Sequence, residues 1–244
     1  MVRSAHRVAI VTGGTSGIGA ATAESLKRAG LHVVATYSGD ADRAAAFAAH
    51  TGIPVRRWSV ADFGACRDGV AEIERAHGTV DILVNNAGVT RDTTLAKMTP
   101  FQWQEVIDVD LTSCFNMAHA VFPGMCARKW GRIVNISSIN GQAGQYGQTN
   151  YAAAKAGMIG FTKALAQEGA RHGVTVNAVA PGYTDTEMVR AVPAEVLDKI
   201  IARIPVGRLA SPAEIARCVL FFTAEDAGFV TGATLSVNGG QLMV

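Results

Sequence analysis

The chain has 244 residues, of which 49% are hydrophobic and 17% are charged, and its formal net charge is +2. A charge this small, without any run of basic residues, argues against nucleic acid as a partner. No apolar run reaches the roughly 20 residues that a bilayer span requires. The four cysteines, Cys66, Cys114, Cys126 and Cys218, lack the spacing of a metal site or a disulfide framework. We therefore expect a soluble cytoplasmic protein that binds neither a membrane nor a metal.

Short apolar segments alternate with longer helical segments along the whole chain. The segments expected as strands are Arg7–Thr12, His32–Tyr37, Val55–Val60, Ile82–Asn85, Gly131–Ile136, Val174–Val179 and Thr234–Val237. The segments expected as helices are Gly17–Arg28, the alanine-rich stretch after Asp42, Phe63–His77, Pro100–Met125, Thr149–Ala170, Pro193–Ile201 and Pro212–Thr223.

This alternation predicts an α/β fold, because strands that are apolar throughout belong to a parallel sheet covered on both faces. No linker, repeat or low-complexity tract interrupts the pattern. We expect a single doubly wound Rossmann domain over residues 1–244, with a parallel sheet of about seven strands. Ligands of such folds bind beyond the carboxyl ends of the strands, so the loops that follow the strands should carry the function.

A glycine-rich loop joins the first expected strand to the first expected helix and reads Thr12-Gly-Gly-Thr-Ser-Gly-Ile-Gly19. Its glycines at positions 13, 17 and 19 let the backbone turn sharply and approach a pyrophosphate, and the helix N-terminus offers N–H donors. The spacing GxxxGxG predicts a dinucleotide-binding loop. An ordinary turn between strand and helix is the alternative.

The end of the second strand governs the choice of cofactor, because a carboxylate there binds the ribose of NAD and repels the 2′-phosphate of NADP. Tyr37 and Ser38 stand at that point, and the first carboxylate after them is that of Asp40. Tyr37 and Ser38 can donate hydrogen bonds to a phosphate. Arg43 could also reach it, although we expect a solvated side chain at the start of the next helix. The sequence favours NADPH, with NADH as the second candidate.

Tyr151 and Lys155 are four residues apart in an expected helix, so their side chains share one face. A lysine ammonium and an oxidised nicotinamide both favour an ionised phenol, which makes the hydroxyl a usable general acid or base. Ser138 closes the fifth strand, where its hydroxyl can hold a substrate carbonyl. A Tyr-x-x-x-Lys pair alone is common on surfaces, and a serine there can simply cap the strand. The combination predicts a carbonyl-reducing site.

Two further loops follow strands at the same edge of the sheet. Asn85-Asn86-Ala-Gly88 is small enough for its backbone to pass close to a cofactor, and Pro181–Thr186 suits contacts to nicotinamide and phosphate. Each could also be a plain turn. The residues expected to bind the cofactor are Gly13, Thr15, Ser16, Gly17, Ile18, Gly19, Tyr37, Ser38, Val60, Asn86, Ala87, Gly88, Tyr151, Lys155, Pro181, Gly182, Thr184 and Thr186.

These motifs, in this order, resemble those of the short-chain dehydrogenase/reductase family over essentially the whole chain. The set comprises TGGTSGIG, NNAG, the Ser138, Tyr151 and Lys155 triad, the Pro-Gly after the sixth strand, and Val237-Asn-Gly-Gly240. The resemblance implies that Tyr151 is the proton donor and that Ser138 orients the carbonyl. It also implies that Lys155 binds the nicotinamide ribose and tunes Tyr151, and that the protein is a homotetramer.

Within the family, Asn135–Tyr151, Val89–Asp92 and Ala180–Tyr183 are most similar to acetoacetyl-CoA reductases of polyhydroxybutyrate synthesis. That resemblance implies reduction of acetoacetyl-CoA to (R)-3-hydroxybutyryl-CoA. The substrate-binding residues that it implies are Ser138, Gln145, Tyr146, Gln148 and Tyr183. The 3-oxoacyl-ACP reductases of fatty acid synthesis are the alternative, but they tend to lack the glutamine pattern and to carry Phe in place of the last tyrosine. Without the resemblance, the glutamines would fit a polar surface loop equally well.

One position departs from the family pattern Val-x-x-Asn-Leu, because the chain reads Val106-Ile-Asp-Val-Asp110-Leu111. In the family, this asparagine helps to hold a water that links the lysine to solvent. Asp110, the fourth expected catalytic residue, has nearly the same shape, but its charge should raise the pKa of Lys155 and weaken the effect of Lys155 on Tyr151. We therefore predict slower turnover than in an Asp110→Asn variant, with similar cofactor affinity.

Two other functions are compatible with parts of the pattern. A non-catalytic dinucleotide sensor or scaffold could keep this fold, but the complete set of Ser138, Tyr151 and Lys155 argues against it. A dehydrogenase for a small or steroid-like alcohol would use NAD. The missing acid after the second strand and the glutamine-rich loop argue against that function.

Overall fold

The computed structural model describes residues 7–190 and 192–244, so residues 1–6 and 191 of the expected domain lie outside the described part. Seven strands form a sheet in the order β3-β2-β1-β4-β5-β6-β7, and each neighbouring pair is parallel. They are β1 (Val8–Val11), β2 (His32–Tyr37), β3 (Val55–Arg57), β4 (Val80–Asn85), β5 (Gly131–Ile136), β6 (Val174–Pro181) and β7 (Thr234–Val237). The predicted α/β fold with a parallel sheet is confirmed.

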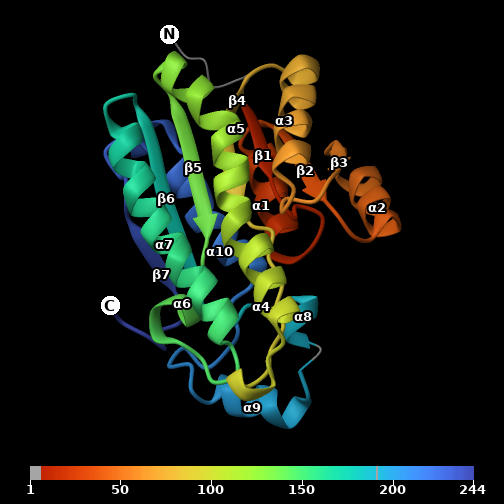
Figure 1. Cartoon of the computed structure of the whole chain (residues 1–244), viewed down its shortest axis with the longest axis vertical. Coiled ribbons are helices and arrows are strands. Elements are labelled where there is room, and N and C mark those ends of the chain that lie inside the picture. The colour runs from red at the N-terminus through yellow and green to blue at the C-terminus, as the bar shows by residue number, and fades with distance from the viewer. Residues whose placement is uncertain (1–6, 191) are drawn as a thin grey trace.

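Helices cover both faces of the sheet (Figure 1). One face carries α3 (Phe63–His77), α5 (Ser113–Arg128) and α7 (Thr149–Ala170), and the other carries α1 (Gly17–Arg28) and α10 (Pro212–Thr223). The short helix α2 (Ala41–Thr51) lies beyond the β3 edge of the sheet (Figure 1). This three-layer arrangement explains why the strands are apolar throughout, since neither face of the sheet meets solvent.

Successive strand residues contribute to two separate cores, because side chains alternate between the faces of a sheet. Ile10 and Leu83 pack into the core beneath α3, α5 and α7, whereas Val11 and Val84 pack into the core beneath α1 and α10. All four side chains are completely buried. The central strands β1 and β4 are therefore fixed from both sides, and the loops that leave them begin from a rigid base.

The expected helix Pro100–Met125 consists of three pieces. A helix α4 (Pro100–Ile107) is followed by a single π-helical turn, η3 (Asp108–Thr112), and then by α5, which ends at Arg128. The predicted long helix is present, because the three pieces follow one another without a break from Pro100 to Arg128. The amphipathic pattern does not reveal the π turn within it, where the hydrogen bonds change from i→i+4 to i→i+5. Such π turns occur frequently at functional sites.

The other differences lie at the edges of elements. The strand expected over Val55–Val60 ends at Arg57, because β3 is an edge strand that pairs only with β2 over these three residues. The short helices α6 (Ile139–Ala143) and α8 (Glu187–Arg190) and the 3-10 turns η2 (Leu95–Lys97) and η4 (Glu225–Ala227) were not predicted. The helix α9 (Ala194–Ile201) begins one residue after its predicted start and ends at its predicted end.

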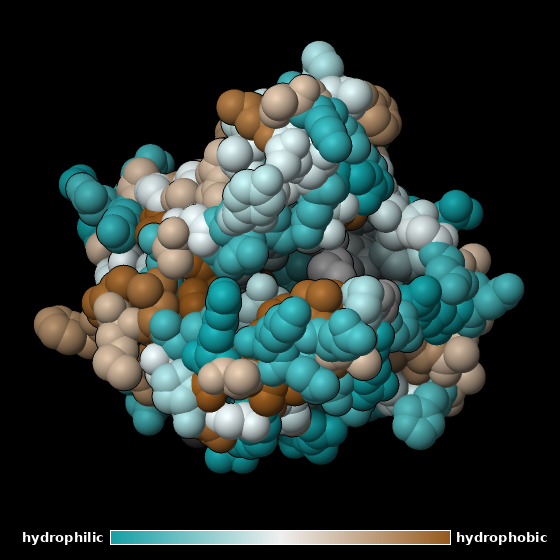
Figure 2. Space-filling model, turned by 90° about the horizontal axis from the view of Figure 1, so that it is seen from below, coloured by the Kyte–Doolittle hydropathy of each residue, from teal (hydrophilic) through white to brown (hydrophobic). Residues whose placement is uncertain are grey.

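The carboxyl ends of the strands point to the lower end of the molecule in Figure 1, where α4, α6, α8 and α9 gather. Figure 2 looks onto this end and shows a hollow near the middle of the face, between groups of mostly hydrophilic side chains. Within residues 7–190 and 192–244, no helix combines the length and the hydropathy of a membrane span. The functional loops predicted from the sequence all leave the sheet at this end.

Candidate active site

The glycine-rich loop turns directly from β1 into α1. Gly13 and Gly17 have φ angles of 60° and 51°, which residues with a side chain rarely adopt. A Cβ at Gly19 would lie 2.2 Å from the carbonyl oxygen of Gly13 and 2.5 Å from Nδ2 of Asn86. Ser16 forms no side-chain cap on α1, and the first turn of α1 contains no acidic residue. The N–H groups and the positive end of the helix therefore suit a pyrophosphate.

Thr12 and Asn86 join the glycine-rich loop to the loop after β4. The backbone N–H groups of Asn86 and Ala87 donate to Thr12 Oγ1 at 3.0 Å and 3.1 Å. Asn86 Nδ2 donates to the carbonyl oxygens of Thr12 and Gly13 at 2.9 Å and 3.1 Å. These bonds hold Ala87 and Gly88 against the first loop. Sequence reasoning missed Thr12, because a threonine before the first glycine carries no chemistry of its own.

Two adjoining cavities lie along these loops and share the wall formed by Gly13, Ala87, Gly88 and Val89. The first has a volume of about 550 Å³ and is lined by Tyr37, Ser38 and Val60. The second has a volume of about 420 Å³ and is lined by Ser138, Tyr151 and Lys155. Every residue expected to bind the cofactor lines one of the two, except Thr15 and Gly19. Adjoining cavities above a glycine-rich loop fit the two halves of a dinucleotide.

Ser138, Tyr151 and Lys155 reach the second cavity from the end of β5 and from α7. Lys155 Nζ lies 5.4 Å from the centre of the Tyr151 ring, one helical turn away. Ser138 Oγ accepts a hydrogen bond from the backbone N–H of Asn140 at 3.1 Å, which leaves its own O–H able to donate to a carbonyl. The neighbouring Ser137 donates to the carbonyl oxygen of Lys155 at 2.9 Å and so ties α7 to β5.

Asp110 lies in the π turn η3 and faces Lys155. Its Oδ1 accepts a hydrogen bond from the Val89 N–H at 2.8 Å, and its Oδ2 lies 3.1 Å from Lys155 Nζ. The same ammonium donates to the carbonyl oxygen of Ile136 at 3.0 Å. Both side chains are buried, with exposed fractions of 0% for Asp110 and 4% for Lys155. Glycine at position 88 makes room for the pair, because a Cβ there would lie 2.8 Å from Asp110 Oδ2.

Burial and charge act in opposite directions on this ion pair. Burial by itself lowers the pKa of Lys155, but the Asp110 carboxylate and then Tyr151 outweigh it, so that the pKa is raised. Burial raises the pKa of Asp110 against the opposing effects of Lys155 and of the Val89 N–H. The direction at Lys155 is the one predicted from the charge of Asp110. The ammonium is therefore held firmly in its protonated form.

Residues 13–241 match the family model described as "Enoyl-(Acyl carrier protein) reductase". The chain belongs to the short-chain dehydrogenase/reductase family. It is 61% identical over 236 residues to an acetoacetyl-CoA reductase of Rhizobium meliloti (strain 1021), covering 96% of this chain and 98% of that protein. It is 49% identical to the acetoacetyl-CoA reductase of Cupriavidus necator, covering 98% and 99%. Identity to the 3-oxoacyl-(acyl-carrier-protein) reductase of Vibrio harveyi is 43%, covering 98% of each chain.

Membership in the short-chain dehydrogenase/reductase family implies a nicotinamide cofactor. Of the substrate residues suggested by the resemblance, Ser138, Gln148 and Tyr183 line the second cavity. Gln148 links two loops, because its Nε2 donates to Asp92 Oδ2 at 2.7 Å and its Oε1 accepts from Asn140 Nδ2 at 2.8 Å. Burial and then the Asp92 carboxylate raise the pKa of Tyr183, so its phenol stays protonated and can donate a hydrogen bond.

Gln145 and Tyr146 line neither cavity. Both are exposed on the loop between α6 and α7, and Tyr146 has an exposed fraction of 87%. The structure thus brings Gln148 to the second cavity and leaves Gln145 on the surface, although both glutamines stand in one short polar segment. Their separate positions depend on how the loop folds, which the sequence pattern of this short-chain dehydrogenase/reductase does not reveal.

Arg43 also lines the second cavity, with a side chain that is 44% exposed. Its guanidinium is not simply solvated, because it lies 3.3 Å from Asp40 Oδ2 and 2.8 Å from Glu187 Oε2. The pairing with Asp40 stays within one helical turn. The pairing with Glu187 joins residues 144 positions apart and could not be foreseen from the sequence.

Proposed function

We propose that this protein reduces acetoacetyl-CoA to (R)-3-hydroxybutyryl-CoA with NADPH, in a single domain that spans the chain. The observation that carries the proposal is the position of Ser138, Tyr151 and Lys155 along one cavity that adjoins the glycine-rich loop. The names of the relatives support the substrate. Identity is 61% to the acetoacetyl-CoA reductase of Rhizobium meliloti and 43% to the acyl-carrier-protein enzyme of Vibrio harveyi.

The chain's own groups would act on the carbonyl oxygen. When bound, NADPH would supply a hydride to the carbonyl carbon. The Ser138 hydroxyl donates a hydrogen bond to the oxygen and holds it near Tyr151. As the C=O π electrons move onto the oxygen, the Tyr151 hydroxyl transfers its proton there and completes the alcohol. Lys155, protonated beside the tyrosine, stabilises the phenolate that is left.

The end of β2 supports NADPH over NADH. Tyr37 and Ser38 line the first cavity, and Arg57 Nε donates to the carbonyl oxygen of Ser38 at 3.4 Å. The nearest following carboxylate, Asp40, caps α2 by accepting from the Arg43 N–H at 2.9 Å. No carboxylate among these residues is placed to receive the ribose hydroxyls, and the Arg57 guanidinium adds positive charge that favours a 2′-phosphate.

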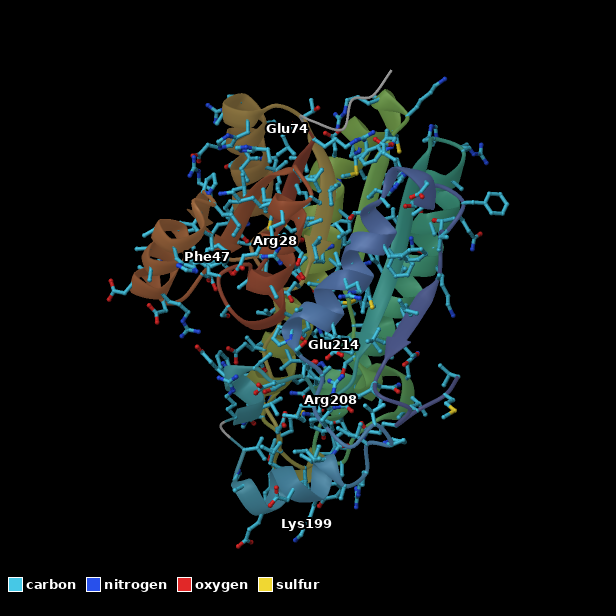
Figure 3. The ribbon with its side chains drawn as sticks, turned by 180° about the vertical axis from the view of Figure 1, so that it is seen from behind. Arg28, Phe47, Glu74, Lys199, Arg208 and Glu214 are labelled. Carbon is cyan, nitrogen blue, oxygen red and sulfur yellow. The ribbon has the colours of Figure 1, made fainter. Side chains whose placement is uncertain are left out.

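The carrier of the acyl group is the finer part of the proposal. Lys199 in α9 and Arg203 just after it are exposed at the open end of the molecule, and Figure 3 shows Lys199 at its outer limit. The exposed carboxylates of Glu195 and Asp198 on the same helix balance these two charges, so the charge at this end does not select between CoA and an acyl carrier protein. The preference for CoA rests on the relatives, and an acyl-carrier-protein thioester is the second candidate.

The test compares acetoacetyl-CoA with acetoacetyl-ACP, each with NADPH and with NADH, by the loss of reduced-nicotinamide absorbance. We expect the highest kcat/KM for acetoacetyl-CoA with NADPH. Faster reduction of acetoacetyl-ACP would show that the acyl-carrier-protein thioester, and not acetoacetyl-CoA, is the preferred substrate. Tight NADPH binding without reduction of either ester would instead support a non-catalytic dinucleotide sensor.

We also propose a homotetramer. Phe63 on α3 and Phe115 on α5 are exposed, with ring centres 5.9 Å apart, and His119 lies 5.1 Å from the Phe63 ring. Exposed aromatic clusters of this kind suit contacts between copies of a chain. Light scattering should give four times the chain mass of 25.5 kDa. A mass equal to that of one chain would contradict the proposal.

A further inference from the structure

A pair of opposite charges joins two walls of the catalytic cavity. Arg43 stands at the start of α2 and Glu187 at the start of α8, and Arg43 Nη1 lies 2.8 Å from Glu187 Oε2. The helix α2 follows β2, whereas α8 follows β6, so the ion pair joins the two halves of the doubly wound sheet. Both side chains line the cavity that contains Tyr151.

A second contact lies next to the ion pair. Thr186 precedes Glu187 in the chain, and a Cβ added at Gly17 would lie 3.2 Å from Thr186 Cγ2. Gly17 is the first residue of α1, where a phosphate is expected to bind. The segment 186–187 therefore contacts the cofactor side of the cavity at two points, the glycine-rich loop and the start of α2.

The segment that makes these contacts is internally braced. Arg190 donates two hydrogen bonds to the Asp185 carboxylate, at 2.7 Å and 2.9 Å. The Asp185 N–H donates to the carbonyl oxygen of Ala210 at 2.8 Å, which anchors one end of the segment. Residues 185–190 thus form a unit that is fixed to its own wall, and Glu187 is its charged contact with the opposite wall.

We propose that the Arg43–Glu187 pair is a strap that closes over the bound dinucleotide, so that these two residues position and retain the cofactor. The proposal rests on the dinucleotide binding proposed above. Gly17 and Arg43, the two points where the segment 186–187 meets the cofactor side, both line the second cavity, so a dinucleotide that fills this cavity would pass beside them. Release then requires the two charges to separate. The strap acts on binding and leaves the proton transfer at Tyr151 unchanged.

The variant Glu187→Gln tests the strap, because it removes the charge, keeps the shape, and replaces a side chain that is 72% exposed. NADPH release is followed by nicotinamide fluorescence when excess NADP+ displaces it. We expect release to become about two- to fivefold faster, the range for loss of an exposed ion pair. NADH release should accelerate by the same factor, since the strap closes over the whole dinucleotide. An acceleration confined to NADPH would make Arg43 a ligand of the 2′-phosphate and overturn the strap.

Salt and a charge exchange give independent readouts. Salt should speed release more in the wild-type protein than in the Glu187→Gln variant, because only the wild-type protein has this exposed pair for salt to screen. The double variant Arg43→Glu with Glu187→Arg should restore slow NADH release. The matched control is Glu72→Gln, which breaks a 3.1 Å pair with Arg56 away from both cavities and should leave release unchanged.

The measurements distinguish an error in the strap proposal from an error in the proposed NADPH-dependent function. A wild-type protein that binds no NADPH overturns both. A wild-type protein that binds NADPH, together with a Glu187→Gln variant whose release rate equals that of the Glu72→Gln control, overturns the strap alone.

Discussion

Asp110 Oδ2 lies 3.1 Å from Lys155 Nζ, and the two side chains form a buried ion pair directly behind Gly88 in the cavity wall. The family resemblance leads one to expect an asparagine at this position, and a neutral amide would leave Lys155 without a negative partner. The carboxylate raises the pKa of Lys155, although burial acts in the opposite direction. It also offsets the positive charge that Lys155 presents to Tyr151.

The variant Asp110→Asn should turn over faster than the wild-type protein. Removal of the carboxylate exposes Tyr151 to the full charge of Lys155, so kcat for acetoacetyl-CoA should rise by about three- to tenfold. The dissociation constant of NADPH should stay the same, because Asp110 is completely buried. Single-turnover rates with NADPH bound in advance isolate the chemical step. Equal or slower turnover in the variant would contradict this account of Asp110.

Gly19→Ala should damage the cofactor site. The added Cβ would lie 2.2 Å from the Gly13 carbonyl oxygen, too close for the loop to keep its shape. We expect NADPH affinity to fall by about tenfold or more and the free energy of unfolding to fall by about 1–3 kcal/mol. Gly160→Ala in α7 is the control, because its Cβ would meet nothing within 4 Å. That variant should gain about 0.5–1 kcal/mol and bind NADPH normally.

Ser38→Asp should reverse the cofactor preference. Ser38 lines the first cavity at the end of β2, where a carboxylate would repel a 2′-phosphate and accept from ribose hydroxyls. We expect the ratio of kcat/KM for NADPH over NADH to fall by about tenfold or more. Ser38→Asn has the same shape without the charge and separates crowding from repulsion. An unchanged ratio in the aspartate variant would place the 2′-phosphate elsewhere.

The ionised carboxylate of Glu214 should stabilise the folded protein, and this stabilisation should be lost at low pH. Hydrogen bonds from Arg208 at 2.7 Å and 2.8 Å, and then one from the Ser211 N–H, lower the pKa of Glu214 from 4.5 to about 2 (Figure 3). A folded pKa below the unfolded one means that this contribution is present above about pH 4.5 and is lost as the pH falls toward about 2.

The variant Glu214→Gln tests that dependence by thermal unfolding. It should be less stable than the wild-type protein at neutral pH, and its Tm should fall less between neutral pH and about pH 3. If the Tm of the variant and the Tm of the wild-type protein change in parallel over the whole pH range, Glu214 does not contribute to the pH dependence of stability.

The main features of the fold could be predicted because each strand is a short apolar run. Such runs predict strands that are buried on both faces, as β4 and β5 are, and hence a parallel sheet. The sequence could also predict which side chains share the catalytic cavity. Tyr151 and Lys155 lie one turn apart in a helix, so local spacing brings them together. Ser138 comes two residues after β5, at the edge of the sheet where the doubly wound fold places its ligand site.

Other features of the site depend on contacts between distant parts of the chain, which the spacing of residues in the sequence does not reveal. The π turn that holds Asp110 differs from an α-helix only in its hydrogen bonds, so the pattern around residues 108–112 gave no sign of it. The pairing of Arg43 with Glu187 arises because α2 and α8 lie at the same end of the sheet. Gln145 and Gln148 separate because only Gln148 is held between Asp92 and Asn140.

The central claim is that Tyr151 supplies the proton in the reduction of acetoacetyl-CoA by NADPH. The most direct test compares NADPH consumption by the wild-type protein and by a Tyr151→Phe variant, with NADPH binding measured in both. The account predicts rapid reduction by the wild-type protein, and a kcat lower by about a hundredfold or more in the variant with NADPH affinity unchanged. A Tyr151→Phe variant that reduces acetoacetyl-CoA at close to the wild-type rate would contradict it.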